Sequence, residues 1–110
     1  MPRNPGKLYQ DILQAISELE VFCKDKDIDD FLEDRQLQLT AERELEIIGE
    51  ALSRLRREYP DHAEAIPDIE KIIGLRNVLA HGYDVLDYEI LWDVIVNRMH
   101  ILKKNISERA

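Results

Sequence analysis

Residues 41–59 of this chain read AERELEIIGEALSRLRREY, and this stretch decides the fold. Its apolar side chains recur with spacings of 4-3-4-3-4, at Ala41, Leu45, Ile48, Leu52, Leu55 and Tyr59. This spacing places them on one face of an α-helix, while charged residues fill most of the remaining positions. The helix is expected to begin between Asp34 and Thr40, with Thr40 as a candidate cap, and to end before Pro60.

Three further apolar stripes have the same helical period. They are Leu8, Ile12, Ile16, Leu19 and Phe22; Ile69, Ile72, Ile73 and Leu79; and Leu91, Ile95, Met99, Leu102 and Ile106. The first predicts a helix over about residues 6–24, and the second a helix that starts near residue 69 and is capped by Gly82. The third predicts a last helix, which Asp87 can cap.

The segments between these stripes predict short connections. One or two helical turns are expected around residues 28–32, after a charged break, and a loop or irregular turn is expected between Pro60 and Pro67. No segment alternates with a period of two, so strands are not expected. The sequence therefore predicts an all-α fold, an antiparallel bundle of four to five helices.

Length and composition fit a single helical domain over residues 1–110. The chain has no run of about 18 apolar residues and no signal-peptide pattern, so we expect neither a membrane span nor membrane binding. The lone Cys23 cannot form an internal disulfide, which fits a reducing cytoplasm as the expected location. His-x-Glu, His-Glu-x-x-His and Cys-x-x-Cys patterns are missing, so neither a metal site nor a cofactor is expected.

Charge is distributed unevenly along the chain. The net charge of −8 argues against a protein that coats nucleic acid through bulk electrostatics. Residues 24–34 hold two lysines against six acidic residues (net −4), whereas residues 98–109 hold four basic residues against one glutamate (net +3). Three further arginines lie at residues 54–57. An RNA site must be local, although solvated helix faces explain each cluster alone equally well.

Residues 76–83, RNVLAHGY, concentrate polar chemistry at the end of a predicted helix. Arginine binds phosphate bidentately, and histidine titrates near neutral pH. His81 is suited to remove a proton from a ribose 2′-OH or to protonate a leaving oxygen, and Arg76 to stabilise charge on the attacked phosphate. Asn77 can orient His81 or bind substrate. These roles predict RNA cleavage without a metal, and no cleavage of DNA, which lacks the 2′-OH.

The spacing within this octapeptide limits how the side chains can meet. Asn77 and His81 are four residues apart and share a helix face, whereas Arg76 and His81 are five apart, about 140° around the axis. Two arrangements would bring the latter pair together. Gly82 can end the helix so that His81 turns, or two chains can pair about a two-fold axis and share a composite cleft. We expect a combination of both.

The same residues resemble the Arg-x4-His-x-Tyr signature of HEPN-fold ribonucleases, specifically the HepT toxin family. The similarity extends to residues 41–51, to residues 66–77 and to the segment from Asp87 to Trp92, so it covers roughly residues 7–106. One departure is Asp68, which stands where many relatives have tryptophan after Ile-Pro. This change affects packing at the start of the helix more than the chemistry of the site.

The resemblance implies a HEPN-like helical bundle, a homodimer in which the two motifs meet in a cleft, and a metal-independent endoribonuclease toxin. It also implies a partner, an MntA-like nucleotidyltransferase antitoxin that transfers AMP to the motif tyrosine, here Tyr83. Added phosphate charge and bulk two residues from His81 would block RNA. Arg76, His81 and Asn77 are the catalytic candidates.

Two other hypotheses remain open from the residues themselves. The chain can be a catalytically weak helical binding module that partners a nucleotidyltransferase, or an antitoxin-like scaffold whose octapeptide is only a helix cap. Two further residues carry structural expectations. Trp92 is expected to anchor the core or an interface, and Gly49 to permit a close approach between helices, because glycine inside a helix is otherwise unfavourable by up to about 1 kcal/mol.

Overall fold

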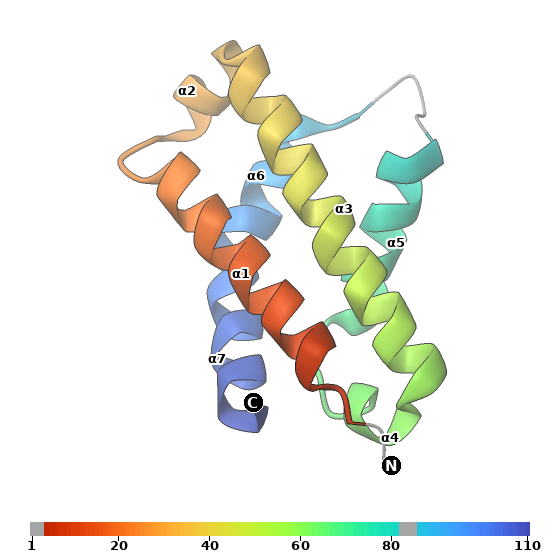
Figure 1. The fold of residues 1–110 in the computed structure, drawn as a ribbon. Coiled ribbons are helices and arrows are strands. Elements are labelled where there is room, and N and C mark those ends of the chain that lie inside the picture. The colour runs from red at the N-terminus through yellow and green to blue at the C-terminus, as the bar shows by residue number, and fades with distance from the viewer. Residues whose placement is uncertain (1–3, 82–85) are drawn as a thin grey trace.

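The fold is helical throughout the described part of the chain, which comprises residues 4–81 and 86–110 of a computed structural model. This part contains seven helices: α1 (Gly6–Cys23), α2 (Ile28–Glu33), α3 (Arg35–Glu58), α4 (Pro60–Ala63), α5 (Ile69–His81), α6 (Tyr88–Asn97) and α7 (Met99–Arg109). Successive long helices run up and down the molecule (Figure 1). The prediction of an all-α antiparallel bundle is therefore confirmed. Gly82 and Tyr83 lie outside the described residues.

Helix α3 is the longest element and follows the predicted stripe. All of that stripe from Ala41 to Leu55 is buried, and Tyr59 is partly buried. The expected cap at Thr40 is wrong, because its hydroxyl donates to the Gln36 carbonyl inside the helix at 2.9 Å. Asp34 caps the helix instead, where its carboxylate accepts from the Leu37 N–H at 3.0 Å.

Two connections differ from the sequence prediction. The segment expected to be a loop contains α4, which begins at Pro60 because proline is well tolerated in a first helical turn. The expected last helix is two helices, α6 and α7, which meet at Arg98. The backbone of Arg98 has φ −112° and ψ −33°, so the chain stays near helical geometry and its apolar stripe continues across the break.

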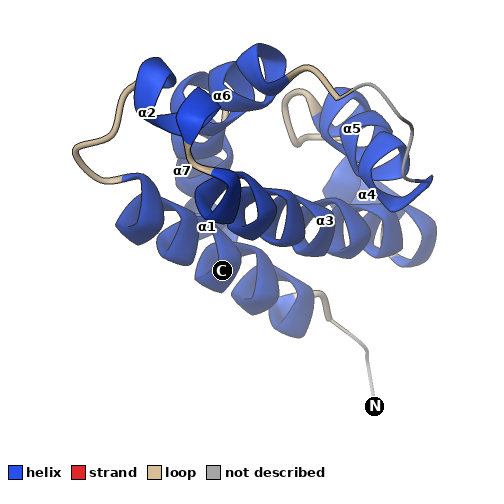
Figure 2. Cartoon of the chain, turned by 90° about the horizontal axis from the view of Figure 1, so that it is seen from above, coloured by secondary structure: helices blue, strands red, loops and turns tan. Residues whose placement is uncertain are grey.

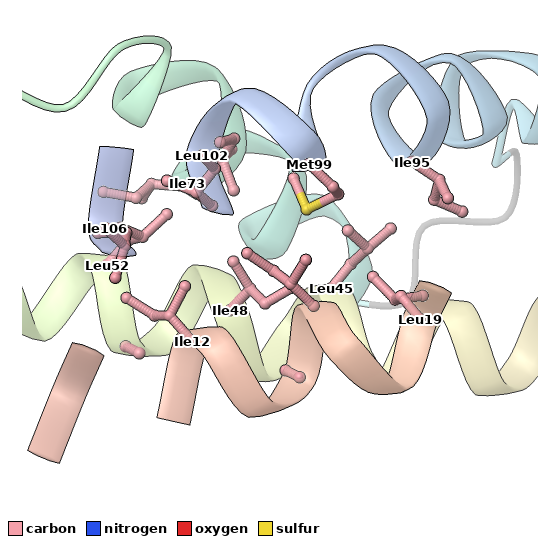
Figure 3. Close-up of a cluster of buried hydrophobic side chains, with 14 of the residues drawn as sticks. Ile12, Leu19, Leu45, Ile48, Leu52, Ile73, Ile95, Met99, Leu102 and Ile106 are labelled. Atoms are coloured by element: carbon pink, nitrogen blue, oxygen red, sulfur yellow. The ribbon is translucent and has the colours of Figure 1, made fainter. Parts of the chain in front are cut away.

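The core lies between α1, α3 and the C-terminal helices. Figure 3 shows Ile12 and Leu19 from α1 facing Leu45 and Ile48 of α3, with Met99 and its neighbours closing the cluster. Figure 2 shows α1 on one side of α3 and α5 on the other, so α3 is the central element. Within the described residues, no helix has the length and apolar character needed to cross a membrane.

The short helix α2 is fixed at both ends by side chains. At its start, Asp27 and Asp30 form a reciprocal capping box. At its end, the buried amide of Gln38 donates to the carbonyls of Phe31 at 2.9 Å and Leu32 at 3.2 Å. Phe31 is fully buried against Trp92, with ring centroids 5.0 Å apart. The prediction that Trp92 is a packing residue is confirmed.

Candidate active site

Gly49 determines where Arg76 lies. The two residues meet where α3 crosses α5, and a Cβ atom built on Gly49 would lie 2.7 Å from the Arg76 Cγ and 3.5 Å from its Cα. A side chain at position 49 would therefore push the helices apart. The expectation that Gly49 permits a close helix approach is confirmed, and the residue that it accommodates is the arginine of the octapeptide.

The guanidinium of Arg76 is held by two oxygen acceptors. Its Nη2 forms an ion pair with the Glu50 carboxylate at 2.8 Å, and its Nη1 donates to the Asn77 side-chain carbonyl at 3.1 Å. The Arg76 side chain remains 30% exposed. Glu50 follows Gly49 in the chain, so the same turn of α3 both admits Arg76 and binds its charge.

Arg76 opens onto a surface cavity of about 280 Å³. The charged residues that line it are three arginines and three acids: Arg43, Arg54 and Arg76, and Asp11, Glu46 and Glu50. Leu8, Ile47 and Ala51 supply its apolar lining. Pockets that enclose a drug-sized ligand have volumes of about 300–1,000 Å³, so this cavity lies just below that range. Its size suits part of an extended ligand, such as one phosphate and its sugar.

Of the predicted site residues, the structure brings Arg76 and Asn77 into contact and leaves His81 on the same helix. α5 continues without interruption to His81, so it does not bend before the imidazole. The angle of about 140° expected between Arg76 and His81 on an ideal helix therefore applies. Both Asn77 and His81 are exposed, which leaves them accessible to a substrate or a second chain.

The arginine cluster of residues 54–57 is only partly associated with this cavity. Arg54 lines it, whereas Arg56 pairs with Glu70 at 2.6 Å on α5. Three basic residues of the C-terminal cluster are engaged elsewhere, since Arg98 pairs with Asp68, Lys103 pairs with Glu20, and Arg109 donates to the Ala65 carbonyl. Arg54 and Arg76 are therefore the basic residues from the sequence clusters that meet at this cavity.

A second, acidic cavity of about 200 Å³ adjoins the first and shares Asp11 and Ile47 with it. Glu44 lies there, 7% exposed, and its Oε2 atom has no donor partner. Burial raises the pKa of Glu44 to about 7, assisted by the charge of Glu18 and a hydrogen bond between the two carboxyls, while Arg43 opposes the rise. A protonated Glu44 carries no charge and can donate a hydrogen bond to Glu18, so protonation lowers the free-energy cost of burying this carboxyl.

Sequence reasoning missed Glu44 and Glu50 for different reasons. Glu44 is three residues after Ala41 and four before Ile48, both core positions, so its burial was readable from the helical period. Glu50 occupies an exposed position on α3, and its pairing with Arg76 depends on the α3–α5 crossing. In the part of the chain that the structure describes, no cluster of three or more His, Cys, Asp or Glu side chains has the geometry of a metal site.

Comparisons with known proteins identify the family of this helical chain. The chain matches the Ribonuclease HepT-like family over residues 12–109. It is 32% identical over 109 residues to a Methanocaldococcus jannaschii protein named as a candidate RNase. The aligned part covers 98% of this chain and 89% of the relative. No solved structure gives a significant match.

Two further relatives come from other organisms. A Caldanaerobacter subterraneus protein, also named as a candidate RNase, is 32% identical over 106 residues, covering 96% of this chain and 94% of its own length. A Thermococcus cleftensis protein named a probable ribonuclease HepT is 32% identical over 103 residues, covering 94% of this chain and 93% of its own. With a family match that spans most of the chain, this protein belongs to the HepT-like ribonuclease family.

Proposed function

We propose that this protein is a metal-independent endoribonuclease toxin that cleaves RNA through Arg76 and His81, with Asn77 as a supporting residue. The observation that carries the proposal is the position of Arg76, which Gly49 admits to an arginine-lined cavity on the helix that ends at His81. Membership of the HepT-like family and the names of the relatives support the same reaction class.

The reaction requires one proton transfer at each end of the phosphodiester. A histidine imidazole accepts the proton of the ribose 2′-OH, and the 2′-oxygen attacks the adjacent phosphorus. The bond from phosphorus to the 5′-oxygen of the next nucleotide breaks, and that oxygen takes a proton. The products are a 2′,3′-cyclic phosphate and a free 5′-OH. Arg76 stabilises the negative charge that develops on the phosphate oxygens.

Glu50 has a defined place in this scheme. The Glu50 carboxylate forms an ion pair with the Arg76 guanidinium. A phosphate, like a carboxylate, offers arginine two anionic oxygens, so it can take the place of Glu50. A bound phosphate would take this position on Arg76, while Asn77, which also bonds the guanidinium, keeps the fork oriented. The Glu50 and Asn77 contacts thus hold the Arg76 guanidinium at the cavity before RNA arrives, although the Glu50 carboxylate competes with phosphate for it.

A homodimer would bring an Arg76 and a His81 side chain together, which one α5 helix does poorly. Arg76 and His81 point about 140° apart on an ideal helix, so one chain presents them poorly to a single phosphate. Two α5 helices related by a two-fold axis would place Arg76 of one chain near His81 of the other, and each of the two composite sites would contain both groups.

The direct test uses a single-stranded RNA and the same strand made entirely of DNA, in the presence of EDTA. We expect cleavage of the RNA only, with a cyclic phosphate on the 5′ fragment. His81→Ala should lower the rate by about 10²–10⁴. His100→Ala is the matched control, since His100 is an exposed histidine on α7, and it should cleave normally. Unchanged cleavage by a folded His81→Ala protein contradicts the assignment.

Mixing two inactive variants tests the composite site separately. If each site takes Arg76 from one chain and His81 from the other, refolding Arg76→Ala together with His81→Ala restores about a quarter of the wild-type activity. Half of the dimers are then mixed, and each mixed dimer has one intact site. No recovery, with both variants dimeric, contradicts a site shared between chains.

The proposed regulation acts through Tyr83. A nucleotidyltransferase antitoxin of the MntA type would transfer AMP from ATP to the phenol oxygen and release pyrophosphate, adding negative charge close to His81. Intact-protein mass spectrometry after co-expression with such an enzyme should show mass added in AMP units. Tyr83→Phe should remove this addition, whereas Tyr59→Phe should retain it.

The specific observation that favours a second function is that both terminal nitrogens of Arg76 already contact an acceptor, Nη2 that of Glu50 and Nη1 that of Asn77. If that pairing persists in the dimer, the chain would act as a catalytically weak binding module for a nucleotidyltransferase. In that case the purified protein cleaves no RNA at any salt concentration, although it binds and is modified by its partner.

A further inference from the structure

A groove on the α2–α6 side of the molecule has no role in the proposed reaction. It has a volume of about 400 Å³, and its apolar lining is Ile28 and Leu32 from α2 with Trp92 and Val96 from α6. Leu32 is 41% exposed and Val96 is 44% exposed. These side chains leave apolar surface in contact with water on a protein that is otherwise strongly charged.

The groove is held in shape by the packing beneath it. Phe31 stacks on Trp92 and also meets Tyr88 edge to face, with ring centroids 6.0 Å apart. The Tyr88 hydroxyl donates to Glu42 on α3 at 3.1 Å and accepts from Arg35 at 2.6 Å. α2 and α6 are thus tied to each other and to α3, so the apolar groove is preformed.

Two of the exposed apolar side chains of the described residues line this groove. Seven large apolar side chains are exposed in the described part of the chain: Val21, Phe22, Leu32, Leu39, Ile90, Val96 and Ile101. Leu32 and Val96 line the groove, and the others except Ile101 lie on α6 or near the ends of α1 and α3 that flank α2 in the chain. This concentration is typical of a surface that another molecule covers.

The charge around the groove is uniformly negative. Asp29 of α2 and Glu89 and Asp93 of α6 line it, and none of its described lining residues is basic. Asp29 belongs to the segment of residues 24–34, whose net charge of −4 was unexplained by the nuclease chemistry. The acidic stretch therefore contributes one carboxylate, Asp29, to the groove.

We propose that this groove is a docking site for an amphipathic helix of a partner protein, with leucine-like side chains on one face and lysine or arginine flanking them. The apolar face would cover Leu32, Trp92 and Val96, and the basic flanks would pair with the three carboxylates. This site is separate from the Arg76 cavity, and it does not depend on the nuclease proposal.

The negative charge of the groove argues against RNA and against a second copy of the chain as its occupant. Phosphates of RNA would be repelled by Asp29, Glu89 and Asp93. A second copy of the chain, paired through the same face about a two-fold axis, would bring the two acidic rims together. A basic amphipathic helix matches both the apolar lining and the acidic rim.

Trp92 makes the proposal directly measurable, because it is the only tryptophan of the chain and lines the groove. The probe is a synthetic helical peptide of leucine and lysine, about 18 residues long, which spans about 27 Å. Titrated into the full-length protein, it should shift Trp92 emission to saturation, and more weakly at high salt. A leucine–glutamate peptide of the same length should have no effect.

Two pairs of variants locate the binding. Val96→Asp should weaken peptide affinity about tenfold, whereas Ile101→Asp on α7, a comparable exposed apolar position, should leave it unchanged. Asp93→Lys should weaken it about fivefold, and Glu108→Lys, the same charge change on α7, should weaken it much less. Far-UV circular dichroism confirms that each variant is folded.

Three results would overturn the proposal. One is equal peptide affinity in folded Val96→Asp and Ile101→Asp. Another is a saturable shift of Trp92 emission when a single-stranded RNA oligonucleotide is titrated in without the peptide, which would show that RNA occupies the groove. The third is self-association of the chain that Val96→Asp abolishes, which would show that a second copy covers the groove.

Discussion

The α3–α5 crossing and the α2–α6 contact hold their helices in opposite ways. At the first, Gly49 leaves out a side chain so that Arg76 can approach, and an ion pair to Glu50 completes the contact. At the second, Phe31 and Trp92 fill the space between the helices with aromatic rings. The stability of the α3–α5 crossing should therefore fall when a side chain at the contact is enlarged. The stability of the α2–α6 contact should fall when a side chain is truncated.

This difference matches the two proposed roles, catalysis at the crossing and partner recognition at the groove. The crossing positions a polar group whose usefulness depends on its exact orientation, and its cavity contains equal numbers of arginines and acids. The α2–α6 groove offers apolar area with charge of one sign, which suits binding without catalysis. Damage to one region should therefore leave the function of the other largely intact in molecules that remain folded.

The largest expected effect comes from removing the aromatic ring of Phe31. Phe31→Ala should lower the free energy of unfolding by about 3–5 kcal/mol, because it leaves a cavity beneath Trp92. Phe22→Ala is the control, since Phe22 is the other phenylalanine of the chain and is 45% exposed, so its loss should matter little. Urea unfolding measures both, and equal losses would contradict the role given to Phe31.

A pH titration should distinguish the α1–α3 side of the site from the groove. Burial raises the pKa of Glu44 from 4.5 to about 7, so the folded state holds this proton more tightly than the unfolded chain. The resulting stabilisation is present in full below about pH 4.5 and is lost as the pH rises through about 7. The loss should be on the order of 2 kcal/mol.

Urea unfolding between pH 5 and pH 8 measures this loss directly. Glu44→Gln, which keeps a hydrogen-bonding group without a titrating proton, should flatten the dependence. Glu46→Gln, on the same helix, should retain it. If the wild type and Glu44→Gln have the same pH profile, the raised pKa of Glu44 is not the source of the pH dependence.

Adding one methyl group at the crossing should produce the next effect. Gly49→Ala places a Cβ against Arg76 and should lower stability by about 1–3 kcal/mol while displacing the guanidinium and reducing RNA cleavage. Gly74→Ala is the control within α5, because no atom lies within 4 Å of the added Cβ. It should be neutral or stabilising by up to about 1 kcal/mol. Equal behaviour of the two variants would contradict the close approach.

The smallest change in stability is expected from Glu50. Glu50→Gln should alter unfolding by less than about 1 kcal/mol, since the pair is partly exposed. It should nevertheless tighten binding of an uncleavable all-DNA strand, because phosphate no longer competes with a carboxylate for Arg76. Glu70→Gln serves as the control, because it removes the charge from a comparable exposed ion pair, that of Glu70 with Arg56. Weaker binding by Glu50→Gln would show that Glu50 positions Arg76 without competing.

Much of the fold could be predicted because burial follows a simple period. The stripe of α3 and the caps at Asp87 are local features, and both occur as expected. The division at Arg98 was not predictable from the stripe, because a backbone change at one residue leaves the spacing of Met99 and its neighbours intact. The helix at Pro60 was missed because four residues carry no periodic signal.

The candidate site was predictable only in part. Arg76, Asn77 and His81 were selected from residue chemistry, and their placement on one helix follows from the sequence. The pairing of Arg76 with Glu50 depends on how α5 crosses α3, and that tertiary contact leaves no mark on local spacing. Gly49 was the one local sign of the crossing, although the sequence did not identify its partner.

The contact between Gly49 and Arg76 also has a consequence for the family's evolution. Any residue other than glycine at position 76 has its own Cβ, so an enlarged residue 49 cannot be accommodated by a simple exchange of Arg76. Relatives that lose this glycine must either separate the two helices or place glycine at position 76. Positions 49 and 76 should therefore change together among relatives, and a relative with a side chain at position 49 alone should hold these two helices further apart.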